Sequence, residues 1–261
     1  MGEFEFSLYP EEARLLAGRR ALVTGADSGI GQATAFELAA HGAAVAINHV
    51  GDASTARAIA EAIESAGGRA TTVQMDVSRE PDVARGFADA RDALGGLDLL
   101  VNNAGVQKAY DLVDMPLETW QKVLDVNLTG AFLCCREAAR VMDRGTIVVN
   151  TSVHEVMPWM RFSHYAASKG GLKLFVQSIA KELAPRGIRI CSVAPGATRT
   201  PIQETEEEPP DVSHEEIPAG RWAEPAEIAR AIAWLASEQA DYVVGTTLFV
   251  DGGMTLYPGT D

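Results

Sequence analysis

The sequence has few cysteines, few cations relative to its acids and no long apolar run, and each shortage excludes a class of protein. Three cysteines are an odd number, and their positions fit neither a disulfide framework nor the spacing of a metal site. We therefore expect no metal and a reducing, cytoplasmic setting. The N-terminal region lacks an apolar signal segment, and no later run reaches the length of a membrane span.

The charge balance is strongly acidic. Lys and Arg number 22 against 36 Asp and Glu, which gives a formal net charge of -14. A polyanion or an anionic membrane would be repelled, so nucleic acid and membrane partners are not expected. Hydrophobic residues make up 47% and charged residues 22% of the chain, which is the profile of a soluble globular protein.

Apolar runs that end in turn-forming residues alternate with helical patterns over most of the 261 residues. This alternation predicts one α/β domain at residues 19–261, with a parallel sheet covered on both faces. Residues 1–18 are interpreted as an N-terminal extension on the surface. Residues 202–218 are acidic and contain prolines without helical or strand periodicity, so they predict either a substrate lid or a plain solvated loop.

A glycine-bearing turn follows the first apolar run. Residues 20–24 predict a short buried strand, and a helical pattern that stops at Gly42 begins soon after it. In this setting free amides at the helix start can face the pyrophosphate of a dinucleotide. Ordinary turn-making glycines explain the spacing equally well. The candidate dinucleotide contacts in this turn are Gly25, Asp27, Ser28, Gly29, Ile30 and Gly31.

The ends of the second and third predicted strands would lie beside the adenosine half of a bound dinucleotide. An acidic residue after the second strand would bind the ribose hydroxyls, and an arginine would pair with a 2′-phosphate. The chain offers Asn48 as a ribose contact, and Val50 brings no cation, which favours NAD over NADP. Asp76 and Val77 follow the third strand. Asp76 either receives the adenine amino group or caps the next helix.

Two later strand ends carry small or rigid residues. The fourth predicted strand runs into Asn-Asn-Ala-Gly, where small side chains would let the backbone lie against a nicotinamide ribose, although these are also ordinary turn formers. The sixth strand ends in a rigid Pro-Gly turn that could present amides and hydroxyls to the dinucleotide. The candidate contacts are Asn103, Ala104, Gly105, Pro195, Gly196, Thr198 and Thr200.

Tyr165 and Lys169 lie four residues apart, so on a helix their side chains share one face. An ammonium beside a phenol stabilises the phenolate and lowers the tyrosine pKa toward the range of a general base. Ser152 ends the fifth predicted strand and places a hydroxyl at the carboxyl edge of the sheet, where open α/β folds bind ligands. Taken alone, the Tyr/Lys pair is more often an exposed helical pair.

A long apolar helical pattern covers residues 117–142 and contains Asn127 followed by Gly130. Both residue types are poor in a helix interior. We therefore expect a local distortion, in which the Asn127 amide or a freed carbonyl holds a water. A tolerated helical asparagine is the simpler alternative.

These motifs stand in one order over most of the chain: Thr24-Gly-x-x-x-Gly-Ile-Gly31, Asn102-Asn-Ala-Gly105, Asn127, Ser152, Tyr165-x-x-x-Lys169 and Pro195-Gly196. The combination resembles the short-chain dehydrogenase/reductase family. The resemblance implies a doubly wound Rossmann-type fold with about seven parallel strands, a homotetramer, and NAD or NADP as cofactor. It also implies a catalytic tetrad of Asn127, Ser152, Tyr165 and Lys169, with Tyr165 and Lys169 also touching the cofactor.

Within the family, the strings SVHEVMPW, HYAASKGGLKLF and YVVGTTLFVDGGMTLYP resemble the glucose 1-dehydrogenase subfamily. The chain has Gln107 where that subfamily has a glutamate, and Val50 where it has an arginine. His154 matches a sugar-contacting position, or serves to fix Glu155. Gln107 and His154 are therefore the candidate substrate contacts.

The function expected from the resemblance is hydride transfer between the carbon of an alcohol or sugar hydroxyl and a nicotinamide. An aldose 1-dehydrogenase is the first reading. A carbonyl or polyol reductase of the same family is the nearer alternative, and a dinucleotide-binding sensor without turnover is the farther one.

Overall fold

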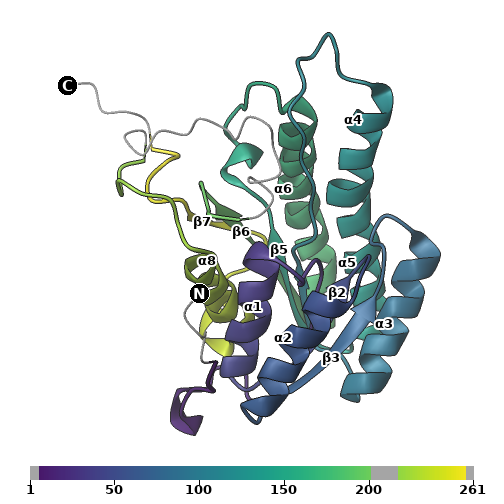
Figure 1. Ribbon diagram of the computed structural model, residues 1–261, viewed down its shortest axis with the longest axis vertical. Helices are drawn as coiled ribbons and strands as arrows, with labels where there is room; N and C mark the ends of the chain where they lie inside the picture. Colours follow the sequence, from purple (N-terminus) through teal and green to yellow (C-terminus); the bar gives the residue numbers. More distant parts are fainter. Residues whose placement is uncertain (1–5, 201–216, 257–261) are drawn as a thin grey trace.

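The computed structural model describes residues 6–200 and 217–256, and its core is one sheet of seven parallel strands (Figure 1). The strand order is β3-β2-β1-β4-β5-β6-β7. This order confirms the predicted α/β, doubly wound class. The strands are β1 (Arg20–Val23), β2 (Ala44–His49), β3 (Arg69–Gln74), β4 (Leu99–Asn102), β5 (Gly145–Asn150), β6 (Ile188–Pro195) and β7 (Thr247–Val250).

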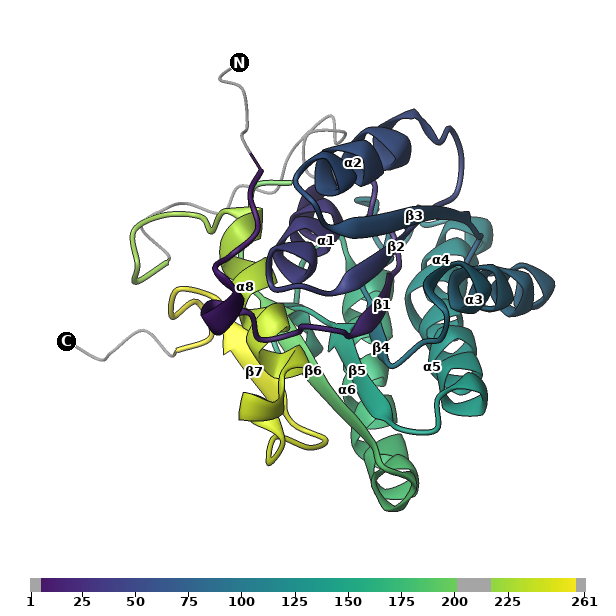
Figure 2. The same cartoon turned by 90° about the horizontal axis from the view of Figure 1, so that it is seen from below.

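The helices form two layers, one on each face of the sheet, as Figure 2 shows. One apolar cluster joins the sheet to α1, α2 and α8, and a second joins it to α3, α5 and α6. Both faces of the sheet are therefore shielded from solvent, which explains why the central strands are apolar on both sides. The helices are α1 (Gly29–Ala40), α2 (Ser54–Ser65), α3 (Glu80–Leu94), α4 (Leu117–Leu124), α5 (Gly130–Val141), α6 (Ser163–Leu183) and α8 (Pro225–Ala236).

The chain leaves β1 for β2 on one side, whereas β4 pairs with β1 on the other side. Strand order thus reverses between β1 and β4. In open α/β sheets, ligands bind at the carboxyl end of the strands that flank such a reversal. The fold therefore places a binding crevice above the ends of β1 and β4.

The helical stretch at residues 117–142 is broken, as the sequence predicts. A π-helical turn at Asp125–Thr129 separates α4 from α5. Asn127 lies in this turn with 1% of its surface exposed. Single π-turns inside helices are frequent at functional sites. The Asn127 side chain lies inside the fold and not on the helix surface.

The N-terminal segment does not lie wholly on the surface, which corrects the expectation for residues 1–18. Leu16 is 1% exposed and belongs to the core cluster beside α1. The backbone of Tyr9 donates to Ala40 at the end of α1, and Phe6 packs on Phe36 with ring centroids 5.1 Å apart. The segment covers one edge of the α1 layer.

Most of the candidate lid at residues 202–218 lies outside the described residues. Ile217, at its end, is buried. Among the described residues, no helix is long and apolar enough to cross a membrane.

Candidate active site

A cavity of about 800 Å³ opens at the carboxyl edge of the sheet, above the strand reversal. It is lined from the glycine turn, the ends of β3, β4, β5 and β6, and the start of α6. The predicted site residues that line it are Gly25, Asp27, Ser28, Gly29, Ile30, Asp76, Val77, Asn103, Ala104, Gly105, Gln107, Ser152, His154, Tyr165, Lys169, Pro195, Gly196, Thr198 and Thr200. Gly31, Asn48 and Asn127 lie behind this lining.

Asn48 is not a ribose contact, and this corrects the sequence-based expectation. Its side chain is fully buried under the glycine turn. Its Oδ1 accepts the Gly25 amide at 3.0 Å, and its Nδ2 donates to the carbonyls of Val73 and Met75 at 3.2 and 2.9 Å. Asn48 therefore holds the glycine turn against β3. Val50 lines the cavity in its place.

The glycine turn is shaped so that only glycine fits at three points. Gly25 and Gly29 have φ of 57° and 52°, a left-handed conformation that side chains rarely adopt. A Cβ on Gly31 would overlap the Gly25 carbonyl oxygen and lie 2.6 Å from Asn103 Nδ2. The turn leaves backbone amides at the start of α1 bare toward the cavity, a cradle that suits a pyrophosphate.

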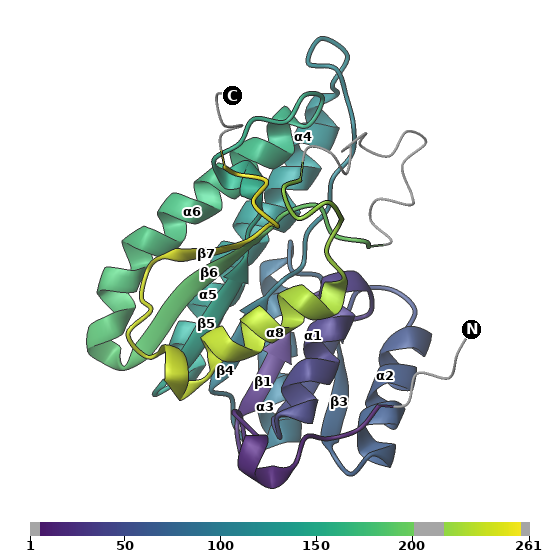
Figure 3. The same ribbon diagram turned by 90° about the vertical axis from the view of Figure 1, so that its left-hand side faces the viewer.

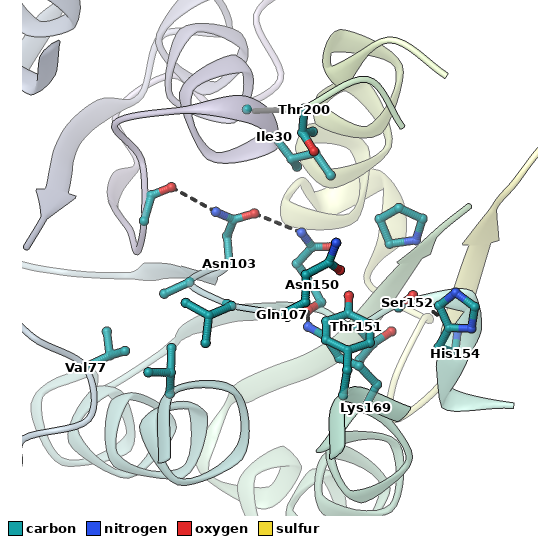
Figure 4. Close-up of a pocket in the computed structure, with 18 of the residues that line it drawn as sticks. Ile30, Val77, Asn103, Gln107, Asn150, Thr151, Ser152, His154, Lys169 and Thr200 are labelled. Atoms are coloured by element: carbon teal, nitrogen blue, oxygen red, sulfur yellow. Dashed lines mark hydrogen bonds between the residues drawn. The ribbon is translucent and has the colours of Figure 1, made fainter. Parts of the chain in front are cut away.

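Asn103 and Asn150 tie the glycine turn to the middle of the sheet. Thr24 Oγ1 accepts the amides of Asn103 and Ala104 at 2.9 and 3.0 Å. Asn103 Nδ2 donates to the carbonyls of Thr24 and Gly25, each at 3.0 Å. Figure 4 shows the next link, in which Asn150 Nδ2 donates to Asn103 Oδ1 at 2.8 Å. The sequence analysis did not single out Asn150, because a strand-end asparagine has no distinctive spacing.

Lys169 is 4% exposed, so its charge lies inside the protein. Its Nζ donates to the Asn150 carbonyl at 3.0 Å and lies 5.5 Å from the centre of the Tyr165 ring. Burial lowers the pKa of Lys169 to about 8, and the negative charge of Glu155 opposes that shift. The amine therefore sits beside the phenol, as the four-residue spacing predicts.

The pKa of the Tyr165 phenol shifts in the direction opposite to the expectation. Burial raises the pKa of Tyr165 to about 12, and a hydrogen bond with the Ser152 side chain pulls it the other way. Desolvation of the phenolate, not the neighbouring amine, dominates in this structure. The pKa of Tyr165 thus shifts in the direction opposite to the predicted one, whereas Tyr165 and Ser152 line the same cavity, as the sequence predicts.

Asn127 lies under the loop that follows β4. Its Oδ1 accepts the Val106 amide at 2.8 Å, and its Nδ2 donates to the Val106 carbonyl at 3.0 Å and to Ser168 Oγ at 3.1 Å. A Cβ on Gly105 would lie 3.5 Å from Asn127 Oδ1 and 3.8 Å from Lys169 Nζ. The Asn127 side chain thus fixes the loop that carries Gly105 beside Lys169. That leaves its backbone, in the π-turn, as the part that could hold a water.

An aromatic stack forms one wall of the cavity, and sequence spacing gave no signal of it. The rings of His154 and Trp159 are stacked 4.2 Å apart, and those of Trp159 and Phe162 are stacked 3.8 Å apart. The Tyr165 ring meets Trp159 edge-on at 5.7 Å. The stack holds the Trp159 ring against the Tyr165 ring at the cavity wall.

Among the described residues, only one ring nitrogen of His154 has a hydrogen-bond partner. Its Nδ1 lies 3.2 Å from the Met157 carbonyl, and only a protonated nitrogen can donate to a carbonyl. Burial lowers the pKa of His154 to about 4, so the ring is neutral near pH 7 and Nε2 is an acceptor. In the part of the chain that the structure describes, Glu155 is bonded to Thr247 and paired with Lys173, and no hydrogen bond or ion pair joins its side chain to that of His154.

Gln107 also lines the cavity, and its Nε2 is buried without a hydrogen-bond partner among the described residues. Buried amide donors are normally paired. An unpaired donor at a cavity wall is suited to a hydrogen-bond acceptor on a ligand.

At the adenosine end, Asp76 Oδ1 accepts both the amide and the hydroxyl of Ser78, at 2.9 and 2.7 Å. Asp76 thus closes a local turn with Ser78 and does not cap α3, whose N-cap is Arg79 without a side-chain hydrogen bond, and Asp76 also lines the cavity with Val77 and Val50. The crevice has a glycine cradle at one end and a Tyr/Lys/Ser cluster at the other. This arrangement fits a dinucleotide.

Known proteins resemble this chain over nearly its whole length. Residues 25–255 match the family described as enoyl-(acyl carrier protein) reductase. A 3beta-hydroxysteroid dehydrogenase from Eggerthella lenta is 46% identical over 94% of this chain and 96% of its own length. A glucose 1-dehydrogenase from Gluconobacter oxydans is 43% identical over 92% and 93%. The crystal structure of a short-chain type dehydrogenase/reductase from Mycobacterium marinum, 35% identical, covers 93% of this chain and 97% of that one with a TM-score of 0.87.

Fold, site and similarity define an oxidoreductase of the Rossmann type. The chain belongs to the short-chain dehydrogenase/reductase family, whose members act on CH–OH or carbonyl groups with NAD or NADP. A solved relative from Burkholderia cenocepacia, 36% identical over 92% of this chain and 99% of its own, with a TM-score of 0.87, is a complex with NADP.

Proposed function

We propose that the protein moves a hydride between the carbinol carbon of a ring-bearing alcohol and a nicotinamide, with Asn127, Ser152, Tyr165 and Lys169 as the catalytic groups. The observation that carries this proposal is the meeting of Tyr165, Ser152 and Lys169 at one end of a cavity whose other end is a glycine cradle. The nicotinamide supplies the hydride acceptor or donor.

The side chains handle the proton and the substrate oxygen. Ser152 holds the oxygen against Tyr165, and Tyr165 takes the hydroxyl proton in oxidation or returns it in reduction. Lys169 supplies positive charge beside the phenol, and the backbone at Asn127 holds a water that passes the proton on. Because the pKa of Tyr165 is about 12, the phenol is protonated at pH 7. Oxidation should therefore accelerate as pH rises, and kcat/KM measured against pH checks this.

We infer that NAD is preferred over NADP. The second strand ends at a cavity wall made by Val50, and the neighbouring lining residues Ser28, Asp76 and Ser78 bring no cation to a 2′-phosphate. The ratio of kcat/KM for the two dinucleotides tests this, and it should favour NAD. Val50→Arg should shift the ratio toward NADP. A wild-type preference for NADP would contradict the inference.

The inner pocket presents one acceptor, His154 Nε2, and one donor, Gln107 Nε2, on the substrate side. A ring that carries hydroxyl groups satisfies both, so an aldose fits the innermost part of the pocket. The glucose 1-dehydrogenase relative supports this candidate. A hydroxylated polycycle also places a ring hydroxyl there, and the hydroxysteroid dehydrogenase relative supports it. The two candidates differ in what the outer part of the substrate touches.

A spectrophotometric screen of aldoses, polyols and ketones with NAD and NADP side by side tests the activity. Turnover of an alcohol or its ketone is the expected result. Tight dinucleotide binding without oxidation or reduction of any compound would instead support a non-catalytic sensor.

We further propose that the chain works as a homotetramer. Phe132 on α5 and Leu174 on α6 are 40% and 64% exposed, and large apolar side chains on neighbouring helices are suited to a subunit contact. Light scattering after size exclusion measures the mass, and a monomer would contradict the proposal.

A further inference from the structure

A fully buried hydroxyl joins two elements that carry the proposed catalytic groups. The broken helix α4–α5 runs alongside α6 in Figures 1 and 3, and its π-turn contacts that helix. Ser168 lies on α6 directly before Lys169 and has 0% of its surface exposed. Its hydroxyl accepts Asn127 Nδ2 at 3.1 Å and donates to the Tyr165 carbonyl at 2.7 Å. One side chain therefore ties the π-turn to the part of α6 that carries Tyr165 and Lys169.

The stability of α6 does not account for this serine. A serine inside a helix that donates back to a carbonyl of the preceding turn slightly destabilises the helix, and alanine is the better helix former. Ser178, on the same helix, makes such a bond to the Leu174 carbonyl at 2.7 Å, but its side chain is exposed and bonds no other element. The contact with Asn127 is what distinguishes Ser168 from Ser178.

A second contact seats the π-turn on α6 one turn farther along. A Cβ on Gly171 would lie 3.1 Å from Leu128 Cδ2, which is tighter than ordinary van der Waals contact. The preceding Gly170 differs, because its Cβ would meet nothing closer than the Glu155 carbonyl oxygen at 3.9 Å. The π-turn therefore meets α6 through one hydrogen bond, at Ser168, and one close apolar contact, at Gly171.

The π-turn in turn holds the loop after β4. Asn127 bonds both backbone groups of Val106. A Cβ on Gly105 would lie 3.5 Å from Asn127 Oδ1 and 3.8 Å from Lys169 Nζ, so these groups are closely spaced. Gly105, Val106 and Lys169 all line the cavity. A shift of the π-turn relative to α6 would therefore change the gap between this loop and Lys169 at the cavity wall.

We propose that Ser168 and Gly171 are positioning residues, which seat the π-turn on α6 and so hold Asn127 and the loop after β4 at a fixed distance from Tyr165 and Lys169. This rests on the proposed function, in which Tyr165, Lys169 and Asn127 move the proton. Neither Ser168 nor Gly171 lines the cavity, so both act through groups that surround it. Neither touches the glycine cradle, so dinucleotide binding does not depend on them.

The test measures Ser168→Ala and Gly171→Ala with NAD and the alcohol that the substrate screen finds to turn over fastest. Fluorescence titration with NAD gives its Kd and the number of folded sites, and kcat is expressed per site. Misplacement by about 1 Å can cost on the order of 100-fold in rate. We expect kcat to fall about tenfold in Ser168→Ala and about threefold in Gly171→Ala, with KM and the NAD Kd within about twofold.

Two matched controls lie on the same helix. Ser178→Ala removes the same kind of hydroxyl-to-carbonyl bond, and Gly170→Ala adds the same methyl group where there is room for it. Both should keep the wild-type kcat and NAD Kd. Because alanine favours a helix more than glycine does, a lower kcat in Gly171→Ala cannot be ascribed to a weaker α6.

A double variant tests whether Ser168 acts through Asn127. In an Asn127→Ala background, Ser168→Ala should change kcat by less than about twofold, since the contact it removes is already lost. Losses that multiply would overturn the proposal. A wild-type kcat in Ser168→Ala with only a lower melting temperature, or a rise in the NAD Kd as large as the fall in kcat, would also overturn it. Absence of turnover in the wild type, with every alcohol and ketone, would instead overturn the proposed function and this inference with it.

Discussion

The two halves of the cleft, which we assign to the cofactor and to the substrate, are held in place by different means. In the cofactor half, Thr24, Asn48 and Asn103 bind backbone groups of the glycine turn and of the strand ends, so the surface offered to a dinucleotide is mostly backbone. In the substrate half, His154 and Trp159 form part of a ring stack carried by a loop. The first half depends on the fold itself, whereas the second can change by loop substitutions without disturbing the sheet.

Tyr165→Phe should separate the chemistry in the substrate half from dinucleotide binding in the cofactor half most clearly. Loss of the proton-transferring oxygen should lower kcat by about 1,000-fold or more, because general acid–base groups contribute on that scale. The dinucleotide Kd should stay within about twofold, since the glycine cradle is untouched. Steady-state rates and fluorescence titration measure the two quantities. Tyr110→Phe, in the loop between β4 and α4 and outside the cavity lining, is the control. Retained turnover in Tyr165→Phe would refute the tyrosine assignment.

Lys169→Met should impair both turnover and dinucleotide binding. Lys169 lies beside Tyr165 and also donates to the Asn150 carbonyl, and Asn150 in turn holds Asn103. We expect about a 100-fold loss in kcat and a weaker dinucleotide Kd. Lys181→Met, an exposed lysine on the same helix, serves as the control. If kcat falls while the dinucleotide Kd stays constant, the link through Asn150 is wrong.

Gly31→Ala probes the cofactor half alone. The added Cβ would overlap the Gly25 carbonyl oxygen, so α1 must move away from the turn. We expect the dinucleotide Kd to rise by about tenfold or more and the melting temperature to fall, as over-packing typically costs about 1–3 kcal/mol. Gly51→Ala is the matched control, because its Cβ meets nothing within 4 Å. Equal behaviour of the two variants would show that the close approach is unimportant.

The smallest predicted effect lies in the substrate half and depends on pH. The pKa of His154 falls from 6.5 to about 4 on folding, so the unfolded chain binds more protons between these values. Stability should therefore decline as pH drops from 6.5 toward 4, by at most about 3 kcal/mol from this group. His154→Gln should flatten that part of the curve in urea unfolding. An unchanged slope would mean that His154 is not the group that titrates.

Sequence patterns predicted the fold and most of the cofactor half because that half follows from backbone rules. A strand, a glycine turn and a helix fix where amides point, so the place of Gly25, Gly29 and Gly31 at the start of α1 could be predicted, while their contact with a dinucleotide stays a prediction. Asn48 was misassigned because the pattern gives its place at a strand end but not its direction. Its side chain turns inward to the Gly25 amide instead of outward to the cleft.

The substrate half was less predictable because its contacts are between side chains distant from regular structure. The stack of His154 on Trp159 depends on how residues 156–162 fold back, and no periodicity encodes that path. The pKa of Tyr165 was predicted in the wrong direction because spacing shows the neighbouring charge but not the depth of burial. Burial is a property of the whole fold.

The central claim is that a dinucleotide lies across this cleft with its reactive ring beside Tyr165. A crystal structure of the protein with NAD bound tests it most directly. The account predicts the pyrophosphate against the amides that follow Gly29, and the nicotinamide within contact of Tyr165 and Lys169. A dinucleotide bound with its nicotinamide away from Tyr165, or bound outside the cleft, would contradict it.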